Sequence, residues 1–348
     1  MKKLLLTFAA VLLVSFFASA QKKYSVYAVG FYNQENLFDT CHDEGKKDYD
    51  FLPNGSYHWD GLKYSHKLHN MARALADMGT DVLPNVGCAM IGLSEVENAK
   101  VLTDLVNQPA LKARNMQFVH IEGPDKRGID CAMLYNPALF KLESDTLYQY
   151  VQELEKDSAF KTRGFLTIHG KLADEPVTVI VCHWPSRFSG SFYRESAARQ
   201  VKAIKDELLK KNPERKIFVM GDVNDDPVDK SMYQILGAKP EISKVKDGDM
   251  YNPWYNLLAK QGVGTLSYNG AWNLFDQIVM TPNLLDRAGK KDFSKLTFWK
   301  HAIQRMPYLF QTEGKYKGTP KRTTAGGVWL DGYSDHLPVC VYLVKEQK

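Results

Sequence analysis

The segments GDVND at residues 221–225 and SDH at residues 334–336 decide how this chain folds and where its chemistry lies. Each places carboxylate or imidazole side chains beside the end of an apolar run, where a strand meets a loop. Such side chains, brought together, can hold a cation, a phosphate and a water molecule in one cleft. Other polar residues therefore matter when they lie at equivalent positions.

Polar side chains also follow several other predicted strands. They come after the apolar runs 27–32, 90–93, 177–182 and 217–220, and they are Asn33, Glu35, Asn36, Glu95, His183, Asp222 and Asn224. Strand exits can converge on one rim of a sheet, where clefts form. Taken singly, each residue has a plainer interpretation as a solvated glutamate, a structural histidine or part of a turn. Asp276 within FDQIVM is different, because it lies either on a solvated strand face or in the core, where an acid needs a partner.

Short β-branched and aromatic runs alternate with longer amphipathic stretches. The predicted strands span residues 24–32, 89–93, 116–121, 130–135, 162–169, 177–182, 216–220, 274–280 and 339–344. Several neighbouring strands leave no room for a helix between them. We therefore expect hairpins and mixed sheets rather than a wholly parallel sheet.

Two helices are predicted, over residues 59–78 and 192–211. Apolar residues recur at helical spacing in the second, which indicates an amphipathic surface helix, and they are Ala197, Val201, Ile204 and Leu208. The stretches 41–57 and 290–327 are polar and rich in Gly, Lys and Asp. We interpret both as surface excursions.

The first twenty residues have the order of a secretory signal. Two lysines precede an apolar run at residues 4–18, and the small residues Ala-Ser-Ala occupy 18–20. We therefore expect cleavage after Ala20 and export to the periplasm or the extracellular space. A membrane anchor is the alternative, but the apolar stretch is shorter than the ~20 residues that span a bilayer.

The whole chain is 44% hydrophobic, as in a globular protein with a sizeable core. Its length alone fits one large domain or two. Without the two leading lysines its net charge is about +3, so charge identifies no partner, and no protein partner is evident. The cysteines are few and odd in number, so a disulfide framework is not expected, although a single bridge is an alternative; they are Cys41, Cys88, Cys131, Cys182 and Cys340.

The motifs, taken in order, resemble the endonuclease/exonuclease/phosphatase superfamily. The match consists of NQEN at 33–36, SEVEN at 94–98, CHWPSR at 182–187, GDVND at 221–225, FDQI at 275–278 and SDH at 334–336. It favours a single catalytic domain over residues 21–348. The resemblance implies an α/β fold, a four-layer α/β/β/α sandwich. In such a fold two mixed β-sheets pack face to face with helices outside, and the site lies at one end of the sheets.

The resemblance also implies a metal site. Glu95 resembles the principal ligand of a hard divalent cation, which we expect to be Mg²⁺, with Mn²⁺ and Ca²⁺ as alternatives. Asn33, Glu35 and Asp335 would complete or support that site. The cation would polarise a phosphoryl oxygen and offset the charge that grows in the transition state.

The resemblance further implies roles in catalysis. His336 resembles the general base for water, and Asp276 would accept its other ring hydrogen and so gain a partner. Asp222 would orient or protonate a reacting group, and Asn224 would donate a hydrogen bond to a phosphate oxygen. His183 would lie near the phosphate as an acid or a clamp.

Arg187, four residues after His183, is a candidate for a bidentate clamp on a phosphate. The plainer alternative is an ion pair on a loop, with Glu195 as the partner. Arg194 and Arg199, on the following helix, could serve as the clamp instead.

Several features bear on the substrate. Glu97 stands where pancreatic deoxyribonuclease has an arginine that enters the minor groove, and a carboxylate there repels a phosphate backbone. Glu35 is one methylene longer than the aspartate common at its position in the family. Aromatic residues between 251 and 272 could stack on bases or enter a lipid surface, although core packing is expected for most of them. The basic loop at 315–322 either attracts a polyanion or is a solvated surface.

Three functions fit these observations. The first is an exported, metal-dependent endonuclease or exonuclease acting on nucleic acid. The second is a phosphodiesterase or phosphatase acting on a lipid or inositol phosphate. The third is an inactive binding protein with the same fold, which the presence of Glu95, His183, Asp222 and His336 argues against.

Overall fold

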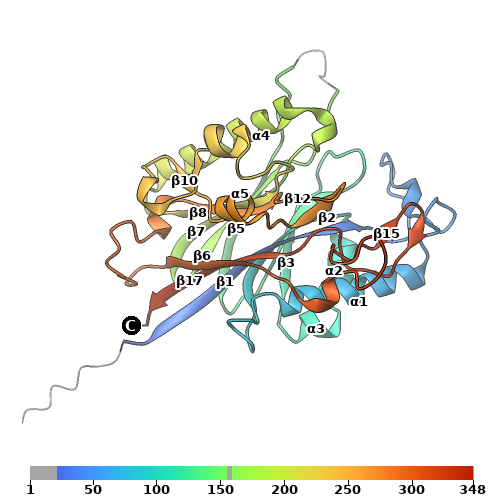
Figure 1. The fold of residues 1–348 in the computed structure, drawn as a ribbon, viewed down its shortest axis with the longest axis horizontal. Helices are drawn as coiled ribbons and strands as arrows, with labels where there is room; N and C mark the ends of the chain where they lie inside the picture. Colours follow the sequence, from blue (N-terminus) through green and yellow to red (C-terminus); the bar gives the residue numbers. More distant parts are fainter. Residues whose placement is uncertain (1–21, 155–158, 348) are drawn as a thin grey trace, which may run out of the picture.

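The two ends of the described chain lie side by side in one sheet. The computed structural model describes residues 22–154 and 159–347, so the signal predicted at 1–20 lies outside the described residues. Strand β1 (Tyr24–Leu37) pairs antiparallel with β17 (Val339–Glu346), and Tyr24 lies opposite Glu346. Figure 1 shows both strands running from this end into the body of the molecule.

One sheet has six strands in the order β14-β17-β1-β2-β4-β3. The further members are β2 (Cys88–Val96), β3 (Gln117–His120), β4 (Asp130–Tyr135) and β14 (Thr297–Ile303). Strands β1 and β2 are parallel, and the other neighbours are antiparallel. The sheet is therefore mixed, as expected.

The second sheet has seven strands in the order β5-β6-β7-β8-β13-β10-β9. They are β5 (Phe140–Tyr148), β6 (Phe165–Leu172), β7 (Glu175–His183), β8 (Lys216–Asp222), β9 (Ala238–Lys239), β10 (Met250–Tyr251) and β13 (Asp276–Met280). The pair β7 and β8 is parallel. Two small hairpins complete the strands, β11 (Leu266–Tyr268) with β12 (Ala271–Asn273) and β15 (Thr324–Ala325) with β16 (Val328–Trp329).

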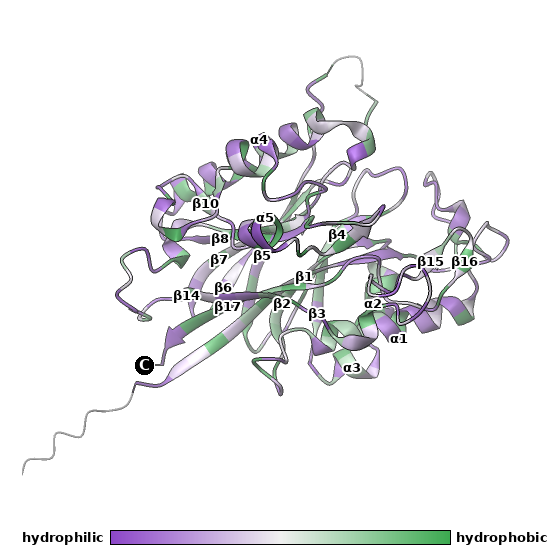
Figure 2. Cartoon of the chain, in the orientation of Figure 1, coloured by the Kyte–Doolittle hydropathy of each residue, from purple (hydrophilic) through white to green (hydrophobic). Residues whose placement is uncertain are grey.

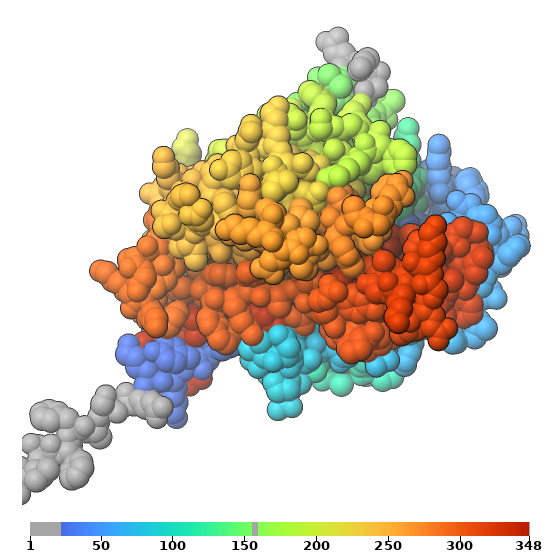
Figure 3. Space-filling model, viewed as in Figure 1, coloured from blue at the N-terminus to red at the C-terminus, as the bar shows by residue number. Residues whose placement is uncertain are grey.

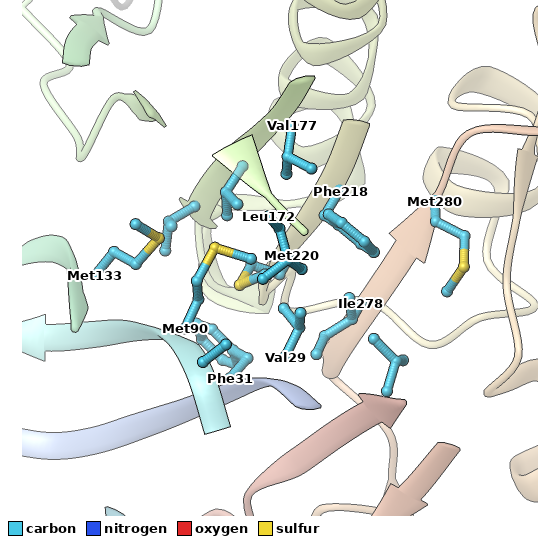
Figure 4. Close-up of a cluster of buried hydrophobic side chains, with 14 of the residues drawn as sticks. Val29, Phe31, Met90, Met133, Leu172, Val177, Phe218, Met220, Ile278 and Met280 are labelled. Carbon is cyan, nitrogen blue, oxygen red and sulfur yellow. The ribbon is translucent and has the colours of Figure 1, made fainter. Parts of the chain in front are cut away.

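The main core lies between the two sheets. Alternation along β1 turns Val29 and Phe31 toward this core, whereas Ala28 and Tyr32 face the helices on the other side. Figure 4 shows Val29 and Phe31 facing side chains from the opposite sheet, among them Phe218 and Met220. The sheets are thus held face to face by apolar side chains.

Helices cover the outer face of each sheet. Helices α1 (Gly61–Asp77), α2 (Ala99–Val106) and α3 (Pro109–Lys112) pack on the six-stranded sheet, and α4 (Ser191–Lys211) packs on the other. Figure 2 shows polar and apolar residues alternating along α4, and its apolar residues Ala197, Ala198 and Val201 pack in one cluster with Ile180, Ile217 and Val219 of the sheet. The prediction of a four-layer α/β/β/α sandwich is confirmed. In the described ranges no helix is both long and apolar enough to cross a membrane.

Shorter helices connect these elements. Helix α5 (Tyr255–Gln261) follows β10, and a π-helical turn spans Ser231–Ile235. The 3₁₀ turns are Tyr49–Phe51, Arg187–Ser189, Ile242–Lys244, Pro282–Leu284 and Pro307–Leu309.

Strands β5 and β14 were not predicted from the sequence. The interpretation of 290–327 as a surface excursion is wrong in part, because β14 lies within it and pairs with β17. Both are edge strands, and apart from the first residue of each their side chains are exposed or half-buried, so neither sequence shows the continuous apolar run of an inner strand. The predicted helix at 59–78 begins at Gly61 because the side chain of Asp60 accepts a hydrogen bond from the backbone of Lys63.

The cysteines are free, and Cys41 is the exposed one. In the predicted aromatic stretch, Tyr251 and Trp254 are buried in the core, as expected. Tyr268 instead lies exposed at the tip of the β11–β12 hairpin.

Candidate active site

Three adjacent strands place three predicted site residues in one row. In the parallel pair of β7 and β8, His183 lies opposite Asp222. In the antiparallel pair of β13 and β8, Asp276 lies opposite the same Asp222. Because β13 runs against its neighbours, its first residue meets the last residue of β8. This topology explains why Asp276 begins an apolar run whereas the other site residues end one.

The six-stranded sheet supplies the rest of the site. Asn33 on β1 lies opposite Ser94 on β2, and Ser334 Oγ donates a hydrogen bond to the carbonyl oxygen of Asn33 at 2.8 Å. The Nδ2 amide of Asn33 donates to Asp222 Oδ2 at 3.0 Å, which joins the two sheets across the site. The motifs that are far apart in the sequence therefore converge at one end of the sandwich.

Four non-glycine residues at the site adopt left-handed backbone conformations. They are Glu35 with φ 45°, Asn36 with φ 56°, Glu95 with φ 59° and Asn224 with φ 52°. The pairing of β1 with β2 shifts register between Asn33 and Leu37, and the pairing of β2 with β4 shifts between Ser94 and Val96. Such irregularities redirect side chains out of the strand alternation, and they cluster at functional sites in proteins.

His336 and Asp276 form a buried pair. Nδ1 of His336 lies 2.7 Å from Asp276 Oδ2, so its Nε2 points toward Asp222 Oδ2 at 3.7 Å and Asp335 Oδ1 at 3.8 Å. Burial acts to lower the pKa of His336. The charges of Asp276 and Asp222 and the hydrogen bond to Asp276 outweigh burial, and the pKa is raised well above its ordinary value. The pair thus fixes both the tautomer and the orientation of the ring.

His183 has the opposite electrostatic setting. Burial above all, and then the positive charges of Arg163 and Arg127, hold the pKa of His183 well below its ordinary value. Its Nε2 lies 3.9 Å from Glu95 Oε1 and 3.7 Å from Asp222 Oδ2. His183 is therefore a neutral ring at neutral pH, suited to donate a hydrogen bond into the site from Nε2.

Asp222 lies at the centre of the row. Its Oδ1 accepts a hydrogen bond from the backbone of Asn224 at 3.0 Å. Burial raises the pKa of Asp222 to about 6; the charge of His336 lowers it, and those of Asp276 and Glu95 raise it. A carboxyl group of this kind can carry a proton in mildly acidic solution.

Glu95 and its neighbours fit a hard cation. Glu95 Oε2 accepts a hydrogen bond from the backbone of Asn36 at 3.0 Å, and Oε1 points toward the site near His183. Glu95 and Asp222 supply carboxylate oxygens, the donors that Mg²⁺ prefers together with several waters. Asn33 turns its Nδ2 toward Asp222, and its Oδ1 accepts a hydrogen bond from the backbone of Glu35, so it supports the site by positioning these groups. The two carboxylates could hold the predicted cation.

The other two predicted metal-site residues contact Arg322. Arg322 Nε donates to Glu35 Oε1 at 3.2 Å, and Arg322 Nη2 donates to Asp335 Oδ2 at 2.9 Å. Glu35 Oε2 also accepts from the backbone of Thr323 at 2.6 Å. Burial, together with the charge of Asp335, raises the pKa of Glu35 to about 7.

A cavity of about 250 Å³ opens beside the two histidines. It is lined by Glu95, Arg127, Phe160, Lys161, Thr162, Arg163, His183, Pro185, Ser186, Ser189, Asp222, Asn224 and His336. The sequence had not pointed to Arg127, Lys161 or Arg163. They belong to the basic segments DKR and KTR, which occupy loops just before β4 and β6. Arg163 is fixed by Asp125 at 3.0 Å and by the carbonyl oxygen of Trp184.

The three arginines proposed as phosphate clamps are all engaged by carboxylates. Arg187 donates to Asp226 and Asp229, each at 3.0 Å, and it does not line the cavity. Its expected partner Glu195 pairs with Lys230 instead. Arg194 pairs with Asp225 at 2.6 Å, and Arg199 pairs with Glu153 at 2.6 Å. Phosphate binding by Arg187 stays a prediction, and its contacts favour a role in fixing the loop that carries Asn224.

Glu97 does not face the cavity. Its side chain is buried, and Oε2 accepts a hydrogen bond from the backbone of Asp39 at 2.7 Å. Burial raises the pKa of Glu97 to about 8. The expectation that Glu97 repels a phosphate backbone therefore loses its basis.

Two further features of the described residues lie apart from this site. His120, Glu122 and Asp130 form a group with metal-ligand spacing, but Lys46 Nζ already lies 2.8 Å from Glu122. A cavity of about 510 Å³ lies at the opposite end of β8 and β13, beside Pro282.

The fold and the row of His183, Asp222 and Asp276 beside His336 are those expected for a hydrolase of phosphoester bonds. The sequence matches the profile of the Endonuclease/Exonuclease/phosphatase family over residues 28–345, and the chain belongs to this family. No curated protein matches the chain.

Solved structures share the fold at low sequence identity. TDP2 from D. rerio, complexed with a single-strand DNA product, has a TM-score of 0.53 at 13% identity, covering 92% of this chain and 99% of that one. The mannosyl-6-phosphatase Bt3783 from Bacteroides thetaiotaomicron has a TM-score of 0.55 at 14% identity, covering 91% and 99%. ANGEL2, a 2′,3′-cyclic phosphatase, has a TM-score of 0.59 at 11% identity, covering 94% and 99%. At these identities the likeness establishes the fold alone.

Proposed function

We propose that this protein is an exported hydrolase of phosphodiesters that uses a divalent cation at Glu95 and His336 as general base. One observation carries the proposal: His336 lines the same cavity as Glu95, His183 and Asp222, and the buried carboxylate of Asp276 holds its ring from behind. An inactive binding protein would have no use for a buried imidazole that is oriented by a buried acid. Residues 21–348 would form one catalytic domain.

The proposed roles follow from the contacts. In the neutral ring Asp276 holds the proton on Nδ1 of His336, which leaves Nε2 to accept a proton from the attacking water. A cation bound at Glu95 would lower the raised pKa of His336 and so favour this neutral form. Neutral His183 and the amide of Asn224 donate hydrogen bonds to phosphate oxygens. Asp222 orients these groups. A cation at Glu95 would supply Lewis-acid polarisation of a phosphoryl oxygen when bound.

Nucleic acid is the first candidate substrate. Arg127, Lys161 and Arg163 bring positive charge to the cavity, which suits a phosphate backbone, and buried Glu97 does not oppose it. A small phosphate ester, such as an inositol or lipid phosphate, is the second candidate. The limited cavity of about 250 Å³ favours it.

A substrate panel with and without EDTA tests both candidates. Plasmid DNA, RNA, inositol phosphates, sphingomyelin and bis-p-nitrophenyl phosphate would each be incubated with Mg²⁺ or Mn²⁺. We expect hydrolysis that EDTA abolishes, and His336→Ala and Asp222→Asn each to lower turnover by at least ~100-fold with the fold intact by circular dichroism. Wild-type turnover in either variant contradicts the role of that residue. A steep loss of affinity with added salt identifies a polyanionic substrate, whereas a small substrate shows little salt dependence.

A further inference from the structure

We propose that this protein holds one divalent cation rather than two, because the guanidinium of Arg322 occupies the second acidic pair of the site. The inference rests on the proposed function, since it takes the cation at Glu95 as the one that remains. It concerns Glu35 and Asp335, which the sequence placed at the metal site without showing whether they contact a metal.

The guanidinium of Arg322 bridges the two carboxylates. Nε donates to Glu35 Oε1 at 3.2 Å, and Nη2 donates to Asp335 Oδ2 at 2.9 Å. Arginine is permanently charged, and its planar fork presents several donors at fixed angles. One side chain therefore satisfies two carboxylates that belong to distant parts of the chain.

The acidic pair needs a positive charge nearby. Glu35 is buried at 4% exposure, and its carboxylate lies close enough to Asp335 for the two charges to interact. Two carboxylates that share a site repel one another unless a cation lies between or beside them. In enzymes with two metals about 4 Å apart, the second ion meets this need. Here Arg322 meets it.

The segment that carries Arg322 is anchored on helix α1. Lys67 Nζ on this helix donates to Thr323 Oγ1 at 2.6 Å and to the carbonyl oxygen of Tyr333 at 2.5 Å. The guanidinium of Arg73 lies 3.9 Å from the centre of the Tyr308 ring. Figure 1 shows β15 beside α1, and Figure 3 shows the segment near residue 320 lying against chain near residue 60.

The Arg322 side chain is 45% exposed, but the backbone that carries it is held at the site. Glu35 Oε2 accepts from the backbone of Thr323, the residue after Arg322, so the contact does not depend on one flexible side chain. Lys67 adds a second, buried positive charge to the group. Two basic side chains thus lie beside two acidic ones, and a second divalent cation would have to displace one of the bases.

The stoichiometry of Mn²⁺ binding tests this inference. Electron paramagnetic resonance of free Mn²⁺, in a titration without substrate, counts the ions bound by each chain. We expect one ion for the wild type, with an affinity that Glu95→Gln lowers at least ~10-fold. Arg322→Ala and Arg322→Gln should each bind two ions, and Glu35→Gln added to either should return the count to one. Arg322→Lys should keep one ion, because lysine retains the charge.

Lys321→Ala is the matched control, since Lys321 is the neighbouring cation and contacts neither carboxylate through its side chain in the described structure. It should bind one ion. Thermal unfolding of each variant verifies that it is folded, and Arg322→Gln keeps a donor to support the loop if Arg322→Ala does not fold. If the wild type binds two ions and Glu35→Gln loses one of them, this inference is overturned and the proposed function is not affected. A single ion in folded Arg322→Gln also overturns it. No ion bound to the wild type overturns the proposed metal-dependent function, and this inference with it.

Discussion

The imidazole of His336 and the carboxylate of Asp276 meet across the two sheets at 2.7 Å, although His336 precedes β17 in one sheet and Asp276 begins β13 in the other. The apolar side chains between the sheets thus determine the position of the pair. The distance between a general base and the group that orients it depends here on core packing.

Asp276→Asn should lower kcat by ~100-fold or more while KM changes little. An asparagine amide can present its nitrogen to Nδ1 and favour the wrong tautomer of His336. The measurement is steady-state hydrolysis of bis-p-nitrophenyl phosphate with Mg²⁺. Asp174→Asn, at an exposed turn, is the control. A kcat within about twofold of the wild type would falsify the pairing role.

Arg127→Ala should raise KM for the natural substrate by ~10-fold and lower kcat less. Arg127 lines the cavity, and its Nη2 lies 3.5 Å from Glu95 Oε2, so its guanidinium is close enough to contact a phosphate oxygen of the substrate. Arg114→Ala removes a half-buried arginine that lies outside the cavity and contacts the carbonyl oxygen of Pro84, and it should leave both constants unchanged. An unchanged KM in Arg127→Ala places the substrate elsewhere in the cavity.

Gly221→Ala should destabilise the protein by about 1–3 kcal/mol. A Cβ at Gly221 would lie 2.1 Å from the carbonyl oxygen of Cys182 on the neighbouring strand, so the backbone of β7 or β8 has to move. That movement also displaces Asp222. Urea unfolding measures the loss, and Gly61→Ala is the control, because a Cβ there meets nothing within 4 Å and Gly61, like Gly221, has no positive φ. If Gly221→Ala and the wild type have equal free energies of unfolding, β7 and β8 can move apart without cost and the prediction is wrong.

His301→Phe should make stability less sensitive to acid. Burial lowers the pKa of His301, whose ring centre lies 5.1 Å from that of Trp254. The unfolded chain therefore takes up a proton below a pH of about 6.5 while the folded chain does not, so His301 costs stability as the pH falls. The phenylalanine variant keeps the ring packing and removes this proton uptake. Urea unfolding at pH 7.5 and pH 5, against exposed His69→Gln as control, should show a smaller acid loss in the variant than in the wild type.

The strand ends that carry the site could be predicted because a buried strand leaves a continuous apolar run in the sequence, and the polar residue that ends the run is easy to recognise. The apolar runs before Glu95, His183 and Asp222 are buried strands, and the polar residue after each one lies at the same end of the sandwich. Asp276 was identified by the conflict between its charge and its apolar neighbours. His336 resolves that conflict.

The cations of the site could not be predicted in the same way. Arg127 and Arg163 lie on loops, where no periodicity tells a cavity-facing arginine from a solvated one. Arg322 belongs to a polar segment whose path over α1 is set by contacts with Lys67 and Arg73. The edge strand β14 escaped prediction because Lys300 and His301 interrupt its apolar residues, and the exposed Trp299 breaks the alternation of buried apolar and exposed polar side chains.

The antiparallel pairing of Tyr24 with Glu346 has a practical consequence. Asn33 lies nine positions after Tyr24 on the same strand. At ~3.3 Å per residue, the candidate active site is therefore roughly 30 Å from this end. A tether attached beside Glu346 would hold the enzyme on a bead or a cell surface with its cavity facing the solution. Immobilisation at this point should leave turnover of even a long polymer unimpaired.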